Sequence, residues 1–173
     1  ADMQVVASAV PIELVTPLAN LNIPLTGIFD GTINIKGKTK NPDAQMAASL
    51  STVSYNGSNL DHIYALATMK DWVIDVNQVL AERDQYKISV AGKVPVAAFV
   101  KDSSIVQGKN ENVNLVIDLS KADLGVVPLF SSYVSAGSGD TSGKIEVTGP
   151  LTNLQAKGVV SISNGSLPFV DVA

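Results

Sequence analysis

The sequence contains no cysteine and only one histidine among its 173 residues. The lack of cysteine excludes disulfide bonds and thiolate metal sites, and it fits an oxidising compartment in which a free thiol is a liability. A serine triad would need His62 as its base, and no Gly-x-Ser-x-Gly motif accompanies that residue. We therefore expect His62 to be a half-exposed strand residue, and we expect no metal, no other cofactor and no enzymatic activity.

Charged residues are also scarce, at 16% of the chain, and the formal net charge is −4. Such a chain offers no basic surface to phosphate groups, which argues against nucleic-acid binding. No apolar run reaches the roughly 20 residues that a membrane-spanning helix needs. Aromatic residues make up 5% of the chain while hydrophobic residues make up 46%, so small aliphatic side chains carry the apolar content. This composition favours a thin β-layer over a thick core.

Most of the sequence alternates apolar and polar residues with a period of two, which predicts strands with one buried face. The clearest strand runs between Gly31 and Gly37, where Ile33 and Ile35 face one way and polar side chains face the other. Further strands are predicted over 3–9, 44–55, 60–69, 72–80, 86–94, 113–119, 143–148 and 156–163. Short polar turns join most of them, so the pattern predicts an all-β, antiparallel meander.

Two segments break this alternation, Pro11 to Asn20 and Ala122 to Val134. In both segments the apolar residues recur three positions apart, which predicts short amphipathic helices. Pro17 and Pro128 lie inside them, and a proline removes a helical hydrogen bond, so neither helix should exceed a few turns.

The two ends of the chain align without a gap at a shift of 112 residues, which places Met3 on Leu115. Alternating strands, both predicted helices and a set of glycines keep this register. The matched glycines are Gly27 with Gly139, Gly31 with Gly143, and Gly37 with Gly149. We therefore expect a segment of a longer β-repeat array, with a repeat unit over about 1–112 and a partial second repeat over 113–173.

Two glycine-bounded strands with the turns that follow them carry a family resemblance. They run from Gly31 to Ala44 and from Gly143 to Gly158, and each turn contains an asparagine. These stretches resemble the repeats of the TamB family, the inner-membrane components of translocation and assembly modules, within the wider AsmA-like family. The second stretch departs from the first at Leu154, which stands where the first has Pro42, so the turn there is expected to differ.

The resemblance implies an elongated antiparallel sheet curved into a U-shaped, taco-like trough with short helices. It also implies a parent protein that is anchored in the inner membrane, crosses the periplasm and meets TamA, an outer-membrane barrel protein. The apolar side chains of the strands would line such a trough and contact phospholipid acyl chains. The candidate lining residues are Ile33, Ile35, Met46, Ala48, Leu50, Trp72, Ile74, Val76, Ile88, Val90, Leu115, Ile117, Ile145, Val147, Val160 and Ile162.

Pattern alone leaves alternatives open. The same apolar residues would also suit a closed sandwich, in which they pack against a second sheet. The leading functional hypothesis is a conduit that carries phospholipid between the inner and outer membranes. The second is a scaffold that holds unfolded outer-membrane or autotransporter strands at its sheet edges by β-augmentation. The third is a structural spacer with a closed core and no accessible groove.

Overall fold

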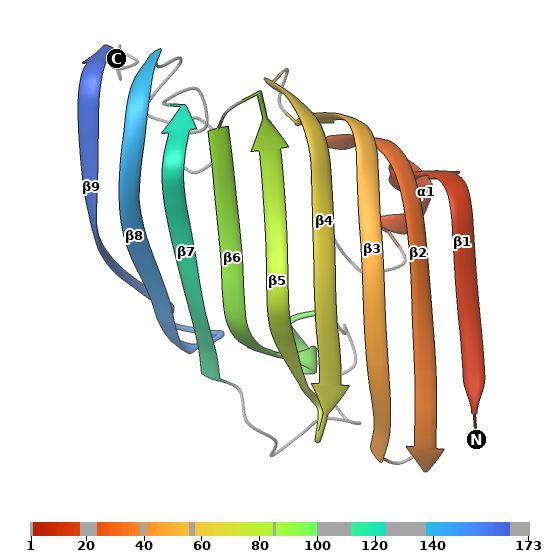
Figure 1. The fold of residues 1–173 in the computed structure, drawn as a ribbon. Helices are drawn as coiled ribbons and strands as arrows, with labels where there is room; N and C mark the ends of the chain where they lie inside the picture. Colours follow the sequence, from red (N-terminus) through yellow and green to blue (C-terminus); the bar gives the residue numbers. More distant parts are fainter. Residues whose placement is uncertain are drawn as a thin grey trace, which may run out of the picture.

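The structure, a computed structural model, describes residues 2–17, 24–38, 41–55, 58–84, 86–99, 112–123 and 138–166. Within these ranges the chain is almost entirely β (Figure 1). The strands are β1 (Met3–Pro11), β2 (Leu25–Lys38), β3 (Asn41–Tyr55), β4 (Ser58–Lys70), β5 (Val73–Arg83), β6 (Tyr86–Pro95), β7 (Asn112–Asp123), β8 (Ser138–Pro150) and β9 (Gln155–Ser166). The helical elements are α1 (Ile12–Val15) after β1, and the 3-10 turn η1 (Val96–Ala98) after β6.

All strands of the described ranges belong to one antiparallel sheet, and each pairs with its neighbours in the chain, from β1 through to β9. Figure 1 shows β1 and β9 at opposite edges, so the sheet is open and does not close into a barrel. The prediction of an all-β antiparallel meander is thereby confirmed. The described strands form no second sheet, so they do not make the closed sandwich that the apolar pattern also allowed.

The strand bounds differ from prediction where the backbone leaves the regular β conformation. β2 begins at Leu25, whereas the sequence predicted a start at Gly31. The alternation is broken before Gly31, because Gly27 has a φ of 146° and the pairing with β3 shifts there. β5 begins at Val73, since Asp71 and Trp72 form the preceding turn with φ angles of 51° and 62°. The prediction that Trp72 opens a strand was therefore wrong.

The first predicted helix exists but is a single turn, α1, which ends before Pro17. Four residues are too few for an isolated helix, so tertiary packing has to hold α1 in place. Ile12 is buried in one cluster with Leu50 and Val53 of β3, and Phe29 of β2 packs against this cluster. The second predicted helix falls outside the described residues, except that its expected first residues, Ala122 and Asp123, belong to β7.

Strand pairing repeats along the chain with the same shift as the sequence. Adding 112 to both residue numbers converts the β1–β2 pairs into β7–β8 pairs, as Met3 with Ile35 becomes Leu115 with Val147. The bulge between Ala7 and Val10 recurs between Leu119 and Ala122. Positive φ angles recur as well, at Gly27 and Gly139, Gly37 and Gly149, and Thr52 and Asn164. The internal similarity is thus a similarity of backbone register, and not only of hydrophobic alternation.

Candidate functional site

Strand register decides which side chains share a face, because residues directly opposite each other in an antiparallel pair point to the same side. From Ile33, the pairings lead sideways to Val5 on β1 and to Met46 on β3. The same row continues through Ala67, Val76, Gly92, Leu115 and Val147 to Ala156 on β9. Every member of this lateral row is apolar, so one side of the sheet carries an uninterrupted apolar band.

Neighbouring rows repeat this composition and together make what we call the apolar face. Its members are Met3, Val5 and Ala7 of β1; Phe29, Gly31, Ile33 and Ile35 of β2; Ala44, Met46, Ala48 and Leu50 of β3; Ile63, Ala65, Ala67 and Met69 of β4; Ile74, Val76, Val79 and Ala81 of β5; Ile88, Val90, Gly92 and Val94 of β6; Val113, Leu115, Ile117 and Leu119 of β7; Thr141, Gly143, Ile145, Val147 and Gly149 of β8; and Ala156, Gly158, Val160 and Ile162 of β9.

The apolar face carries no charged side chain. Its only polar member is Thr141, which is 2% exposed. Charges first occur one row beyond the face, at Arg83, which pairs with Tyr86 at the ends of β5 and β6, and at Asp61, two residues before Ile63 on β4. When an apolar ligand covers this face, no charged group of the protein loses its water. The largest energetic cost of such binding is therefore avoided.

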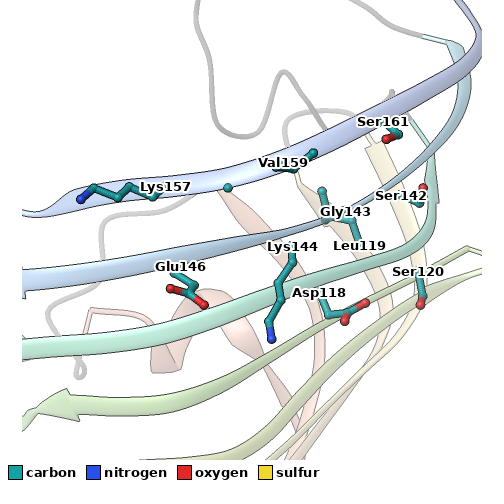
Figure 2. A pocket seen from close by; sticks show the side chains of 11 residues that line it. Asp118, Leu119, Ser120, Ser142, Gly143, Lys144, Glu146, Lys157, Val159 and Ser161 are labelled. Carbon is teal, nitrogen blue, oxygen red and sulfur yellow. The ribbon is translucent and has the colours of Figure 1, made fainter.

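On β7 and β8, burial differs between the two faces of the sheet. The apolar-face residues Leu115, Ile117, Ile145 and Val147 are half-buried, whereas Asp118, Lys144 and Glu146 on the opposite face are exposed. A sheet that curls toward its apolar face produces such a difference. Figure 2 shows the bend of β7, β8 and β9. The bulges favour this bending, because an extra residue lengthens one strand relative to its partner.

The apolar face is large compared with a single hydrophobic patch. Nine strands leave eight gaps of about 4.8 Å, so the face extends over roughly 38 Å across the strands. Along each strand, four positions of the same face span about 20 Å, since the rise is about 3.4 Å per residue. α1 covers one margin of the face, where Ile12 contacts the cluster that contains Leu50.

The structure brings together all but one of the predicted lining residues on the apolar face. The exception is Trp72, which lies in the β4–β5 turn, where its carbonyl oxygen accepts a hydrogen bond of 3.0 Å from the Val96 backbone N–H. Leu50 is on the apolar face but packs against α1. The remaining residues lie side by side across β2, β3 and β5–β9.

The predicted lining residues include none from β1 or β4, although both strands contribute to the face. In β4 both faces carry apolar residues: Ala65 and Ala67 lie on the apolar face, and Tyr64 and Leu66 lie on the other face. Alternation therefore does not indicate which side of β4 belongs to the apolar face. The contribution of β1 had a usable signal, because the 112-residue shift aligns Met3 and Val5 with the predicted lining residues Leu115 and Ile117.

The opposite face is mostly polar and holds several open depressions, two of which illustrate its character. One, of about 720 Å³, lies over β7–β9 and is lined by side chains of both charges (Figure 2). In the strand register, Lys144 lies opposite Asp118, and Lys157 lies opposite Glu146. This balance of charge favours neither an anion nor a cation. The other depression, of about 560 Å³, includes Tyr64 among its lining residues.

Residues with possible chemical roles do not gather into a reactive site within the described ranges. His62 is exposed on β4 and stacks on Tyr64, with ring centroids 5.8 Å apart. No three histidine, aspartate or glutamate side chains of the described part of the chain are placed to hold a metal ion. Among the described residues, no helix combines the length and the apolar character needed to cross a membrane.

Comparison with known proteins adds no relative to this picture: no protein-family model, no curated protein and no solved structure matches the chain. The resemblance to TamB repeats therefore remains a sequence-based hypothesis, and functional inference has to start from the apolar face itself.

Proposed function

We propose that this chain is a segment of a lipid conduit in a two-membrane envelope, and that its apolar face carries phospholipid acyl chains. The observation that supports this proposal is the uncharged apolar face that continues through all nine strands. In the terms of the resemblance, the parent protein is anchored in the inner membrane, crosses the periplasm and meets the outer-membrane protein TamA.

The physical reason is the cost of moving lipid through water. Exposing one methylene group costs about 0.8 kcal/mol, so a phospholipid with two chains of roughly 16 carbons faces a barrier on the order of 25 kcal/mol. A continuous apolar surface removes most of this barrier. Because the sheet is open, the charged headgroup stays in water while the chains lie on the protein, which avoids the cost of burying it.

Site-specific photo-crosslinking in cells that make the full-length protein tests this proposal. The probe replaces Ile74, which lies on the apolar face between Met69 and Val94. The matched control replaces Asp75, the next residue, which points to the opposite face and is half-buried like Ile74. We expect phospholipid to be captured at position 74 and not at position 75.

The scaffold hypothesis predicts a different result from the same experiment. It is favoured by one observation, the uncharged sequence of the edge strand β1. Lipid at neither position would contradict the conduit. A client protein captured by a third probe at Val5, on the β1 edge, would then support the scaffold.

A further inference from the structure

The outer edge of β1 is equivalent to an edge that is already occupied elsewhere in the sheet. The 112-residue shift converts β1 into β7 and β2 into β8, pair for pair and including the bulge. β7 pairs with β8 on one side and with β6 on the other. Among the described residues, β1 pairs with β2 only. Its second side therefore corresponds to the side of β7 on which β6 lies.

The side chains of β1 are those of a paired strand rather than of a protected edge. Edge strands are commonly protected by charged residues, above all lysine, that prevent pairing with other chains. β1 contains no charged residue over its nine positions. Val5 and Val6, on opposite faces of the strand, are 46% and 63% exposed. A further strand at this edge would cover both of them.

We propose that the outer edge of β1 binds an antiparallel strand of the β6 type, contributed by another repeat unit of the same kind. The β6–β7 pairing fixes the register of this strand. Because Ala91 pairs with Val116, and Ser89 with Asp118, an incoming β6-type strand places its Ala91 equivalent opposite Gln4 and its Ser89 equivalent opposite Val6.

This register also continues the apolar face. It places the equivalent of Val90 opposite Val5 and the equivalent of Gly92 opposite Met3, because Val90 pairs with Ile117 and Gly92 with Leu115. The lateral apolar rows would then extend past β1 without a charged residue between them. A strand shifted by one residue would instead turn its apolar side chains to the polar face.

Disulfide trapping tests this inference directly, since the chain has no cysteine of its own. The chain is made with Gln4→Cys or Val6→Cys. The probe is a synthetic peptide with the β6 sequence Tyr86–Pro95, carrying a cysteine in place of either Ala91 or Ser89. All four combinations of chain and peptide are compared under the same mild oxidant.

Two of the four combinations place the cysteines directly opposite each other, Gln4 with Ala91 and Val6 with Ser89. The other two place them diagonally, at Cα separations of about 7–8 Å, beyond what a disulfide usually spans. We expect the opposed combinations to be trapped at least about fivefold more than the diagonal ones.

Equal trapping in all four combinations, or no trapping in any, would overturn the inference. Disulfide-linked dimers of the Gln4→Cys chain that persist in excess peptide would also overturn it, because they would mean that two copies pair through β1. These outcomes are independent of the lipid proposal, which depends on capture at position 74 and not on the edge of β1.

Discussion

Val53 links the helical turn α1 to the sheet. It is 1% exposed and belongs to the buried cluster with Ile12 and Leu50. Val53→Ala removes about two methylene equivalents and leaves a cavity, so we expect the free energy of unfolding to fall by about 2 kcal/mol. Urea denaturation measures the change. Val159→Ala is the control, because Val159 is 76% exposed and its truncation should change stability by less than about 0.5 kcal/mol. Equal losses would mean that the cluster does not stabilise the fold.

Gly92 lies on the apolar face with a φ of 133°, where β6 approaches β7. A Cβ at this position would overlap the carbonyl oxygen of Asn114, so Gly92→Ala forces the two strands apart. We expect a loss of at least about 3 kcal/mol in the free energy of unfolding, from strain and from weakened strand pairing together.

Gly37→Ala provides the comparison for Gly92. Gly37 also has a positive φ, 96°, but the nearest atom to a Cβ there is the Asn41 carbonyl oxygen at 3.6 Å, an ordinary contact. Gly37→Ala should therefore lower the free energy of unfolding by only about 1–2 kcal/mol, the cost of a positive φ for a residue with a Cβ. If both variants lose the same stability, the close approach of β6 and β7 is not what requires glycine at position 92.

Bulges are the feature of the strands that alternation does not reveal. In β5, Asn77 is an extra residue, because Val76 pairs with Gly92 while Val79 pairs with Val90. The bulge returns Val79 to the apolar face, whereas strict alternation would have placed Gln78 there. Strand positions were therefore predictable from the sequence, but the face of residues beyond a bulge was not. The same reasoning explains why the start of β2 at Leu25 was missed, since the pairing with β3 shifts at Gly27.

The bulge at Thr52 predicts a stabilising substitution. Thr52 has a φ of 54°, which is strained for a β-branched residue, and its side chain is exposed. The equivalent position after the 112-residue shift is Asn164, with a φ of 53°. Since asparagine tolerates this conformation, we expect Thr52→Asn to raise the free energy of unfolding by about 0.5–1 kcal/mol.

Thr148→Asn is the matched control for this gain. Thr148 is exposed and lies in the regular part of β8, where it pairs with Gln155. Asparagine has a lower strand propensity than threonine, so this variant should be slightly destabilised, by a few tenths of a kcal/mol. Chemical denaturation of both variants gives the comparison, and a loss at both positions would argue against strain at Thr52.

At the scale of the whole molecule, the antiparallel meander and most of the apolar face were predictable because the sequence alternates with a period of two, but the same alternation also allowed a closed sandwich. Curvature was expected from the family resemblance rather than from the residues. The strand register could be predicted in part, from the 112-residue shift that aligns Met3 with Leu115. The position of Trp72 in a turn could not be predicted, since a tryptophan at positive φ is rare and its apolar character indicated a strand.

The lipid proposal makes a prediction for the face as a unit. Ile117→Lys places a charge in the middle of the apolar face, between Val90 and Ile145. A charge against acyl chains costs about 3 kcal/mol, so we expect phospholipid binding to weaken by roughly a hundredfold. Co-purification of labelled phospholipid measures this, and circular dichroism checks that the sheet is retained.

Val116→Lys is the matched control for Ile117→Lys. It adds the same charge at the next residue, which is also half-buried but points to the opposite face, between Ala91 and Glu146. Lipid binding should be unchanged in this variant. A similar loss in both variants would indicate a general effect of charge on the sheet and would contradict binding at the apolar face.

The strand order of the meander has a consequence for how the chain folds. Every strand pairs with the next one in the chain, so no strand has to wait for a partner from the far end of the sequence. Folding can start at any hairpin and spread outward, as in repeat proteins whose units contact only their neighbours. Such a chain can acquire structure progressively as it emerges from a ribosome or a translocation channel, and the apolar face grows with each added strand.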